Sequence, residues 1–280
     1  MIAAVRCWAR ELDPLVARVV SGLLLALVIG VLLAIGRPGI YVVVLTLGGL
    51  ALWEFRGLSR RMGQRAPSWL LYPLGLVFAF SGTLLKMVPL EQVLSVALIA
   101  GLSVFLVLPG RREGLGRWAM GLAGAVYIGL PLNYYLLLDE SARRTPGILW
   151  LLLILVTIVV SDAAALLAGM RLGRHPFFPA ISPKKTLEGA LAGLACSVPV
   201  MVLGGTFLLA LPPWHAAVLG LLIGITAQVG DLVESQMKRL ARVKDSSHLI
   251  PGHGGVLDRL DSALFPPIVV FLYASYLHLL

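Results

Sequence analysis

Residues 147–169 read GILWLLLILVTIVVSDAAALLAG, a run of 23 residues in which Asp162 is the only charged side chain. A bilayer core about 30 Å thick needs about 20 apolar residues per helix, so this run predicts a membrane-spanning helix. Outward from it, further apolar runs end where charges, Pro or Gly cluster. We predict an all-α, polytopic integral membrane protein with about nine transmembrane helices, near 15–36, 38–55, 67–84, 91–109, 118–138, 147–169, 187–211, 214–231 and 257–280.

The composition agrees with a membrane protein. The chain has 280 residues, of which 59% are hydrophobic and 13% charged, and its mean hydropathy is +0.92. A water-soluble domain of this size would lack the polar residues to cover its surface. Although the net charge is +9, no compact basic domain with interleaved aromatic residues is present, so no nucleic-acid partner is expected. Two cysteines, Cys7 and Cys196, are too few for a disulfide framework or a thiolate metal site.

The basic residues predict the orientation. If the N-terminus is cytoplasmic, 19 of the 23 Lys and Arg residues fall on cytoplasmic segments, and only Arg37, Lys86, Arg143 and Arg144 lie outside. This is the bias of the positive-inside rule. We expect two regions, 1–146 with five spans and 147–280 with the catalytic machinery. The cytoplasmic loops 171–186 and 232–256 then lie on the same side, where nucleotides and metal ions are available.

The richest polar stretch is GDLVESQMKRLARVKDSSHLIPGHGGVLDRLDS, residues 230–262. Its acidic and basic side chains stand at the mouths of two apolar spans, which indicates a site where oxygen-ligated metal ions meet phosphates. If the eighth span continues as a helix, one of its faces carries Asp231, Glu234, Ser235, Lys238 and Arg242. A solvated helix with ordinary ion pairs four residues apart remains the alternative.

The last predicted span begins with Asp258 and Asp261, which are three residues apart and can face one ion. Acids at a helix N-terminus are also favoured by the helix dipole alone. Just before them, Gly252, Gly254 and Gly255 surround His253. Glycines permit a turn whose N–H groups bind an anion such as a triphosphate, although such turns often have no ligand.

The other polar loop contains Ser182-Pro183-Lys184-Lys185-Thr186 before the seventh span. Ser followed by Pro predicts a helix start at Ser182, and two lysines in a first turn are reasonable if an anion binds there. Positive-inside anchoring is the competing explanation. Asp162, inside an apolar run, is a candidate functional residue by default, with a simple buried ion pair as the alternative.

The stretch from Ser235 to Asp261 resembles, over 27 residues, the signature of the phosphatidate cytidylyltransferase family. The segment Ser182–Gly189 is also similar to that family, whereas the N-terminal half matches only in hydropathy. The chain differs from the family pattern after Asp162, where Ala163, Ala164, Ala165 and Leu166 replace Thr-Gly-Ala-Tyr, and at Leu187, where an aromatic residue is usual.

The resemblance implies that CTP and phosphatidic acid react to form CDP-diacylglycerol and pyrophosphate in phospholipid biosynthesis, with the active site facing the cytoplasm of a bacterial inner membrane. It implies Mg²⁺, with a second metal ion left open, and it leaves homodimerisation open. The implied metal ligands are Asp231, Asp258, Asp261 and, as a further candidate, Asp245. The implied catalytic residues are Asp231, Lys238, Arg239, Lys244, Asp258, Arg259 and Asp261, and the implied substrate-binding residues are Ser182, Lys184, Lys185, Thr186, Gly252, His253, Gly254 and Gly255.

Two other functions stay open from the residues. A CTP-dependent kinase of a lipid alcohol such as a polyprenol would also need many spans and metal-bound CTP, but it would transfer the γ-phosphoryl group. An ion-coupled transporter would use intramembrane acids such as Asp162 and Asp231. The products of a CTP-dependent reaction, or their absence, separate these three functions.

Overall fold

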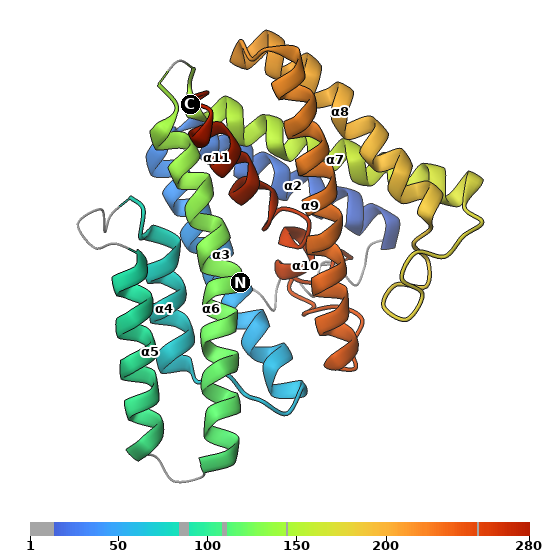
Figure 1. Ribbon diagram of the computed structural model, residues 1–280. Coiled ribbons are helices and arrows are strands. Elements are labelled where there is room, and N and C mark those ends of the chain that lie inside the picture. The colour runs from blue at the N-terminus through green and yellow to red at the C-terminus, as the bar shows by residue number, and fades with distance from the viewer. Residues whose placement is uncertain (1–13, 84–89, 108–110, 144, 251) are drawn as a thin grey trace.

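The computed structural model describes residues 14–83, 90–107, 111–143, 145–250 and 252–280 (Figure 1). Arg6, Cys7, Arg10, Lys86, Arg144 and Pro251 lie outside these ranges. The described chain is helical apart from its loops, and its elements are α2 (Pro14–Ala34), α3 (Arg37–Arg61), α4 (Ser68–Phe80), α5 (Leu90–Val107), α6 (Arg111–Ser141), α7 (Gly147–Leu172), α8 (Leu187–Leu209), α9 (Pro213–Leu240), α10 (Leu257–Leu260) and α11 (Pro266–Tyr276).

The helices confirm the predicted all-α membrane protein. Five of them, α3, α6, α7, α8 and α9, are long and apolar enough in their described residues to cross a membrane. The other apolar helices are shorter over the residues described. Each predicted run contains helix, and five of the nine meet the length criterion over the described residues.

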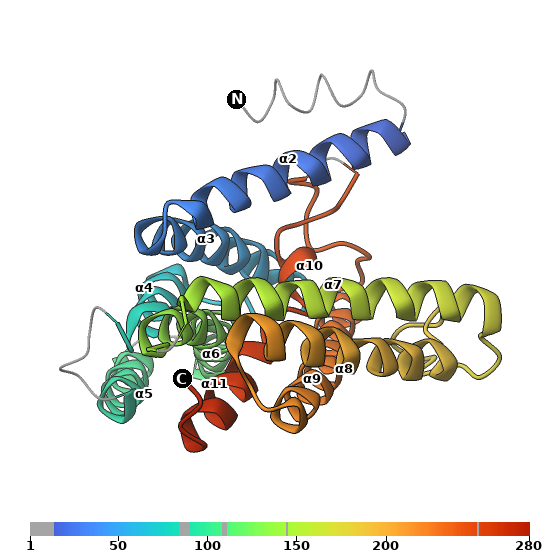
Figure 2. The same cartoon turned by 90° about the horizontal axis from the view of Figure 1, so that it is seen from above.

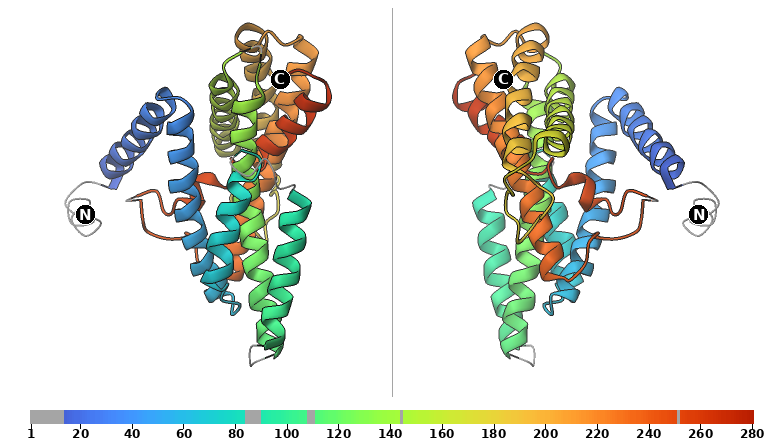
Figure 3. Two further views of the ribbon diagram at one scale, coloured as in Figure 1. Left: turned by 90° about the vertical axis from the view of Figure 1, so that its left-hand side faces the viewer. Right: turned by 90° about the vertical axis from the view of Figure 1, so that its right-hand side faces the viewer.

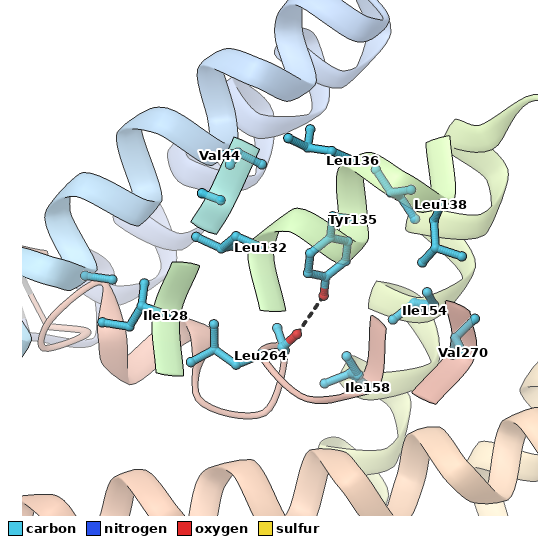
Figure 4. Packing of buried hydrophobic residues seen from close by; sticks show 14 of the residues in the cluster. Val44, Ile128, Leu132, Tyr135, Leu136, Leu138, Ile154, Ile158, Leu264 and Val270 are labelled. Carbon is cyan, nitrogen blue, oxygen red and sulfur yellow. Dashed lines mark hydrogen bonds between the residues drawn. The ribbon is translucent and has the colours of Figure 1, made fainter. Parts of the chain in front are cut away.

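The last predicted span, 257–280, is not one helix. It divides into α10 and α11, separated by a turn, because Pro266 and Pro267 lack the N–H groups that would continue the helix from α10. The N–H missing at residue 267 is the one that would bond the carbonyl of Ala263. Instead, the Tyr135 hydroxyl of α6 donates to that carbonyl oxygen at 2.8 Å (Figure 4). Tyr135 therefore connects α6 to the turn that carries Asp261.

Two other predicted helix ends differ. Helix α8 begins at Leu187 with Thr186 as its N-cap, not at Ser182, and the Thr186 side chain accepts from the Gly189 N–H at 3.2 Å. Thr186 is extended and bridges to Pro176, so a helix cannot begin before it. Helix α9 ends at Leu240, and Arg242, with φ of 55°, leaves the helix and the face on which it was predicted.

The packing brings the two polar loops together at one end of the molecule. Helices α7 and α8 run side by side (Figure 2), and glycines make this close approach possible. A Cβ on Gly189 would lie 2.6 Å from the Ala165 carbonyl oxygen of α7. The buried core, partly shown in Figure 4, includes Ile128 of α6 and Ile154 of α7. The loop after α9 reaches across to α2 (Figure 3), where the His253 ring and the Ser21 hydroxyl are 2.9 Å apart.

Candidate active site

A cavity of about 870 Å³ lies between α7, the start of α8, α9 and the α10–α11 turn. Its volume is within the usual range for ligand sites. Its lining contains charged and polar residues, namely Asp162, Lys184, Lys185, Thr186, Gln228, Asp231, Asp258, Arg259, Asp261 and Ser262. It also contains apolar residues, mostly of α7, namely Leu155, Ile158, Val159, Ala165, Leu166, Met170, Phe177 and Ala263. A ligand with both a charged group and an apolar part matches this mixed lining.

The predicted loop 171–186 meets α9 in this cavity through an ion pair. Lys185 Nζ, just before α8, lies 2.5 Å from Asp231 Oδ2 of α9, and both side chains are 29% exposed. The loop before α8 is held by backbone bonds from Phe177 to Lys185 and from Leu187 to His175. Glu188 strengthens it, since its carboxylate accepts from the backbone N–H of His175 and contacts the ring of that residue at 2.6 Å. Lys185, one of the two lysines predicted to bind an anion, therefore faces Asp231, a predicted metal ligand.

Two further carboxylates, Asp162 and Asp261, line the cavity beside Ser262. The Ser262 hydroxyl donates to Asp162 at 3.2 Å, and the Ser262 N–H donates to Asp261 at 2.6 Å. Helix α9 approaches this turn closely, because a Cβ on Gly230 would lie only 2.3 Å from the Asp261 carbonyl oxygen. Asp231, the next residue on α9, thus faces Asp261 and Asp162 across the cavity.

The donor set suits a hard cation, although it forms no closed cage. Among the described residues, no three or more His, Cys, Asp or Glu side chains converge as a complete metal site. Mg²⁺ commonly uses one or two carboxylates together with substrate phosphates and water, so it needs no such cage. Asp261 lies close to the Asp231 carboxylate, and two negative charges so near to each other repel. A bound cation would relieve that repulsion.

Asp258 has a different environment from the other carboxylates. Its Oδ1 lies 2.7 Å from Lys238 Nζ, and its Oδ2 accepts from the N–H and hydroxyl of Ser246 and from the N–H of Gly255. These four contacts satisfy both oxygens of the Asp258 carboxylate. Asp258 lines the cavity and also fixes the loop beside it.

The glycine turn at residues 252–255, which was predicted to bind an anion, binds the carboxylate of Asp258 instead. Gly254, with φ of +83°, has a conformation that favours glycine, and a Cβ there would lie 2.7 Å from Asp258 Oδ2. The Gly255 N–H donates to the same oxygen at 2.7 Å. Gly252, His253, Gly254 and Gly255 do not line the large cavity. The structure thus places the turn around an acid of the protein itself.

Glu54, to which the sequence reasoning gave no role, is the second anchor of this loop. This residue of α3 is 1% exposed, and its carboxylate accepts from the N–H groups of Val256 and Leu257 and from the hydroxyls of Ser246 and Ser247. An acid within an apolar run is a functional candidate by the same criterion that selected Asp162. Applied to residues 38–55, that criterion would have selected Glu54.

The remaining predicted residues lie near the cavity but outside its wall. Lys238 is half-buried and forms ion pairs with Glu234, four residues earlier, and with Asp258. Arg239 Nε donates to the Ile181 carbonyl at 3.0 Å, so it connects α9 to the loop before α8. The lining excludes these two residues and also Ser182, Lys244 and Asp245.

Comparison with known proteins agrees with this arrangement. Residues 16–277 match the model of the cytidylyltransferase family, so the match includes the N-terminal half. A phosphatidate cytidylyltransferase of Mycobacterium bovis is 31% identical over 221 residues, which cover 77% of this chain and 70% of that protein. One from Mycobacterium tuberculosis is also 31% identical over 221 residues, 77% of this chain and 65% of the relative.

A shorter and more similar match comes from a Staphylococcus saprophyticus phosphatidate cytidylyltransferase, 39% identical over 150 residues, 52% of this chain and 55% of the relative. The chain thus spans about two thirds of the length of the mycobacterial relatives and about half of the staphylococcal one. Because the family match covers nearly the whole chain and one wall of the cavity carries the signature acids, this protein belongs to the cytidylyltransferase family.

Proposed function

We propose that this protein is a phosphatidate cytidylyltransferase, which converts CTP and phosphatidic acid to CDP-diacylglycerol and pyrophosphate. The observation that carries the proposal is the mixed lining of the large cavity, which combines lysines and carboxylates with apolar side chains of α7. The apolar side chains match the acyl chains of a phospholipid, and the lysines match the phosphates of a nucleoside triphosphate. The relatives' names supply the reaction.

The reaction is an attack by a phosphate oxygen of phosphatidic acid on the α-phosphorus of CTP. A new P–O bond forms, the bond between the α-phosphorus and the bridging oxygen breaks, and its electron pair leaves with pyrophosphate. A phosphate monoester has a second pKa of about 6, so the nucleophile is largely ionised at neutral pH. The main barrier is the repulsion between two anionic substrates, which fixed cations offset.

The positions of the basic residues give them different roles in offsetting this repulsion. Lys184 and Lys185, at the start of α8, would hold the phosphates, and Arg259 would stabilise charge from the α10 side. Lys238, Arg239 and Lys244 stand outside the wall, and we propose that Lys238 orients Asp258 rather than contacting phosphate. The apolar wall of α7 would hold the acyl chains.

Mg²⁺ is the proposed cofactor, and it would offset negative charge on the phosphates when bound. We propose Asp231 and Asp261 as its ligands, with Asp162 close to both. Asp258 and Asp245 are less favoured than they were by sequence, since Asp258 already accepts four contacts and Asp245 lies outside the cavity wall.

The topology is also part of the proposal. We propose that the N-terminus is cytoplasmic, that all nine apolar runs lie in the bilayer, and that the cavity opens to the cytoplasmic side of a bacterial inner membrane. The asymmetry of the basic residues supports this orientation.

One assay tests the proposal. Purified protein in detergent is supplied with CTP, Mg²⁺ and phosphatidic acid, and pyrophosphate and CDP-lipid are followed. The two products should form in equal amounts, and Asp261→Asn, which keeps the shape but removes charge, should abolish turnover while the protein still inserts into membranes. Lipid phosphate with CDP from a polyprenol substrate would indicate the lipid kinase instead, and full activity of Asp261→Asn would remove Asp261 from the mechanism.

A further inference from the structure

A second hollow lies at the C-terminal end of α3, and it shares no lining residue with the large cavity. Its volume is about 380 Å³, large enough for a small ligand. We call it the arginine groove, and it is lined by Trp53, Glu54, Arg56, Gly57, Arg60, Arg61, Arg65, Ser246, Ser247 and His248. The proposed reaction uses none of its four arginines.

The local fold explains why the arginines gather. Arg56 and Arg60 are one turn apart on α3, and Arg61 is the last residue of that helix. Gly63, with φ of +83°, then reverses the chain, so that Arg65 returns to the same hollow. Cations favour a helix C-terminus and the cytoplasmic side of a membrane, which accounts for some of this charge. It does not account for four guanidinium groups around one hollow.

The arginines of the groove have no carboxylate partner in the part of the chain that the structure describes. Arg56 Nε donates to the Ala66 carbonyl at 3.3 Å, which fixes that side chain at the groove. Glu54 lines the groove, but its oxygens accept from Ser246, Ser247 and two backbone N–H groups. The guanidinium groups are therefore available to an external anion.

The position of the groove fits a ligand at the membrane surface. Trp53, one turn before the arginines, is 52% exposed. Tryptophan is enriched where the hydrocarbon core meets the headgroups, and guanidinium groups bind phosphate in a bidentate manner. Both features favour a phosphate group at headgroup depth.

We propose that the arginine groove is a second phosphate-binding site, separate from the catalytic cavity. Its ligand is a phosphate carried by an anionic lipid headgroup or by a soluble phosphate such as pyrophosphate. This inference goes beyond the proposed function and does not depend on it.

The groove and the catalytic cavity have a common boundary. Ser246 lines the groove, and its hydroxyl lies 2.9 Å from Glu54 Oε2 and 2.9 Å from Asp258 Oδ2. Asp258 in turn lines the cavity. A phosphate bound beside Ser246 is therefore one residue away from the catalytic wall.

The test compares two matched pairs of exposed arginines on the predicted cytoplasmic side. Arg60→Gln/Arg61→Gln alters the groove, and Arg171→Gln/Arg174→Gln removes the same charge from the end of α7 and the loop after it. Both pairs are made in full-length protein that already carries Lys184→Gln and Lys185→Gln, so that phosphate binding in the catalytic cavity is weakened. One arm measures binding of radiolabelled pyrophosphate in lipid-free detergent. The other counts phosphatidic acid bound per chain by native mass spectrometry, with phosphatidylcholine as competitor.

The groove variant should bind at least tenfold more weakly in one or both arms, while the control pair changes binding less than twofold. Loss in the lipid arm alone identifies a headgroup, and loss in the pyrophosphate arm alone identifies a soluble phosphate. Equal affinities of the two pairs in both arms would overturn the proposal, whether binding is retained by both or lost by both. If the double variant is not monodisperse, Arg60→Gln alone should weaken binding at least threefold, and unchanged binding would be equally decisive. CDP-lipid formation by the unmodified protein is measured separately, so failure of the proposed reaction is distinguishable from failure of this site.

Discussion

Gly230→Ala gives a direct test of the close approach between α9 and the α10–α11 turn. Gly230 precedes Asp231 on α9, and it faces the backbone of Asp261. A Cβ at this position would lie 2.3 Å from the Asp261 carbonyl oxygen, and Cβ atoms essentially never approach other heavy atoms closer than 3.0 Å. Because the obstructing atom belongs to the backbone, no side-chain rotation relieves the overlap.

The expected loss follows from the displacement that the methyl group requires. To reach 3.0 Å from 2.3 Å, the helix and the turn must separate by at least 0.7 Å. A misplacement of about 1 Å in a catalytic site can cost about 100-fold in rate. We therefore expect kcat to fall by roughly 30- to 100-fold. The substitution adds no charge and removes no ligand, so the effect is on the position of Asp261 relative to Asp231.

The assay is CDP-lipid formation with saturating CTP and phosphatidic acid, together with the thermal unfolding midpoint in detergent. Gly49→Ala is the matched control, since Gly49 is also helical and a Cβ there meets nothing within 4 Å. The control should retain full activity. Wild-type kcat in a folded Gly230→Ala protein would refute the reasoning, as would an equal loss in Gly49→Ala.

Three further substitutions and a metal test follow from the same structure. Tyr135→Phe leaves the Ala263 carbonyl without its donor and should cost about 1–3 kcal/mol, seen as a lower unfolding midpoint in detergent; an unchanged midpoint would contradict this role. Glu54→Gln places an amide N–H group opposite the N–H donors of Val256 and Leu257, so it should lower the free energy of unfolding by about 1–3 kcal/mol and lower activity. A variant as stable as wild type would argue against Glu54 as an anchor of this loop. Lys185→Gln leaves Asp231 without its ion-pair partner and should raise the KM for CTP several-fold in steady-state assays, and an unaltered KM would place CTP elsewhere. Excess EDTA should abolish turnover and Mg²⁺ restore it, and full turnover in EDTA would exclude the proposed cofactor.

Patterns in the sequence were sufficient for the fold class and for part of the site wall. Apolar runs predict helices in a bilayer because no water is present there to satisfy backbone groups. The polar motifs and the family resemblance indicated Lys184, Lys185, Thr186, Asp231, Asp258, Arg259 and Asp261, all of which line the cavity. It could not find the break at Pro266 as a functional feature, because the compensating donor, Tyr135, lies 128 positions from Ala263 in the chain.

Sequence alone thus determined which side chains are charged and which segments are apolar, and it predicted that two polar loops share one membrane side. Only the tertiary structure decided which acids of the cavity have their oxygens occupied by donors of the protein. Asp258 and Asp261 are three residues apart, yet Asp258 is held by Lys238 and the Gly255 N–H, whereas Asp261 faces Asp231 and Asp162. Spacing fixes a residue's position along its own helix, but the partners of a buried carboxylate come from distant segments, and they determine whether its oxygens are free to bind a ligand.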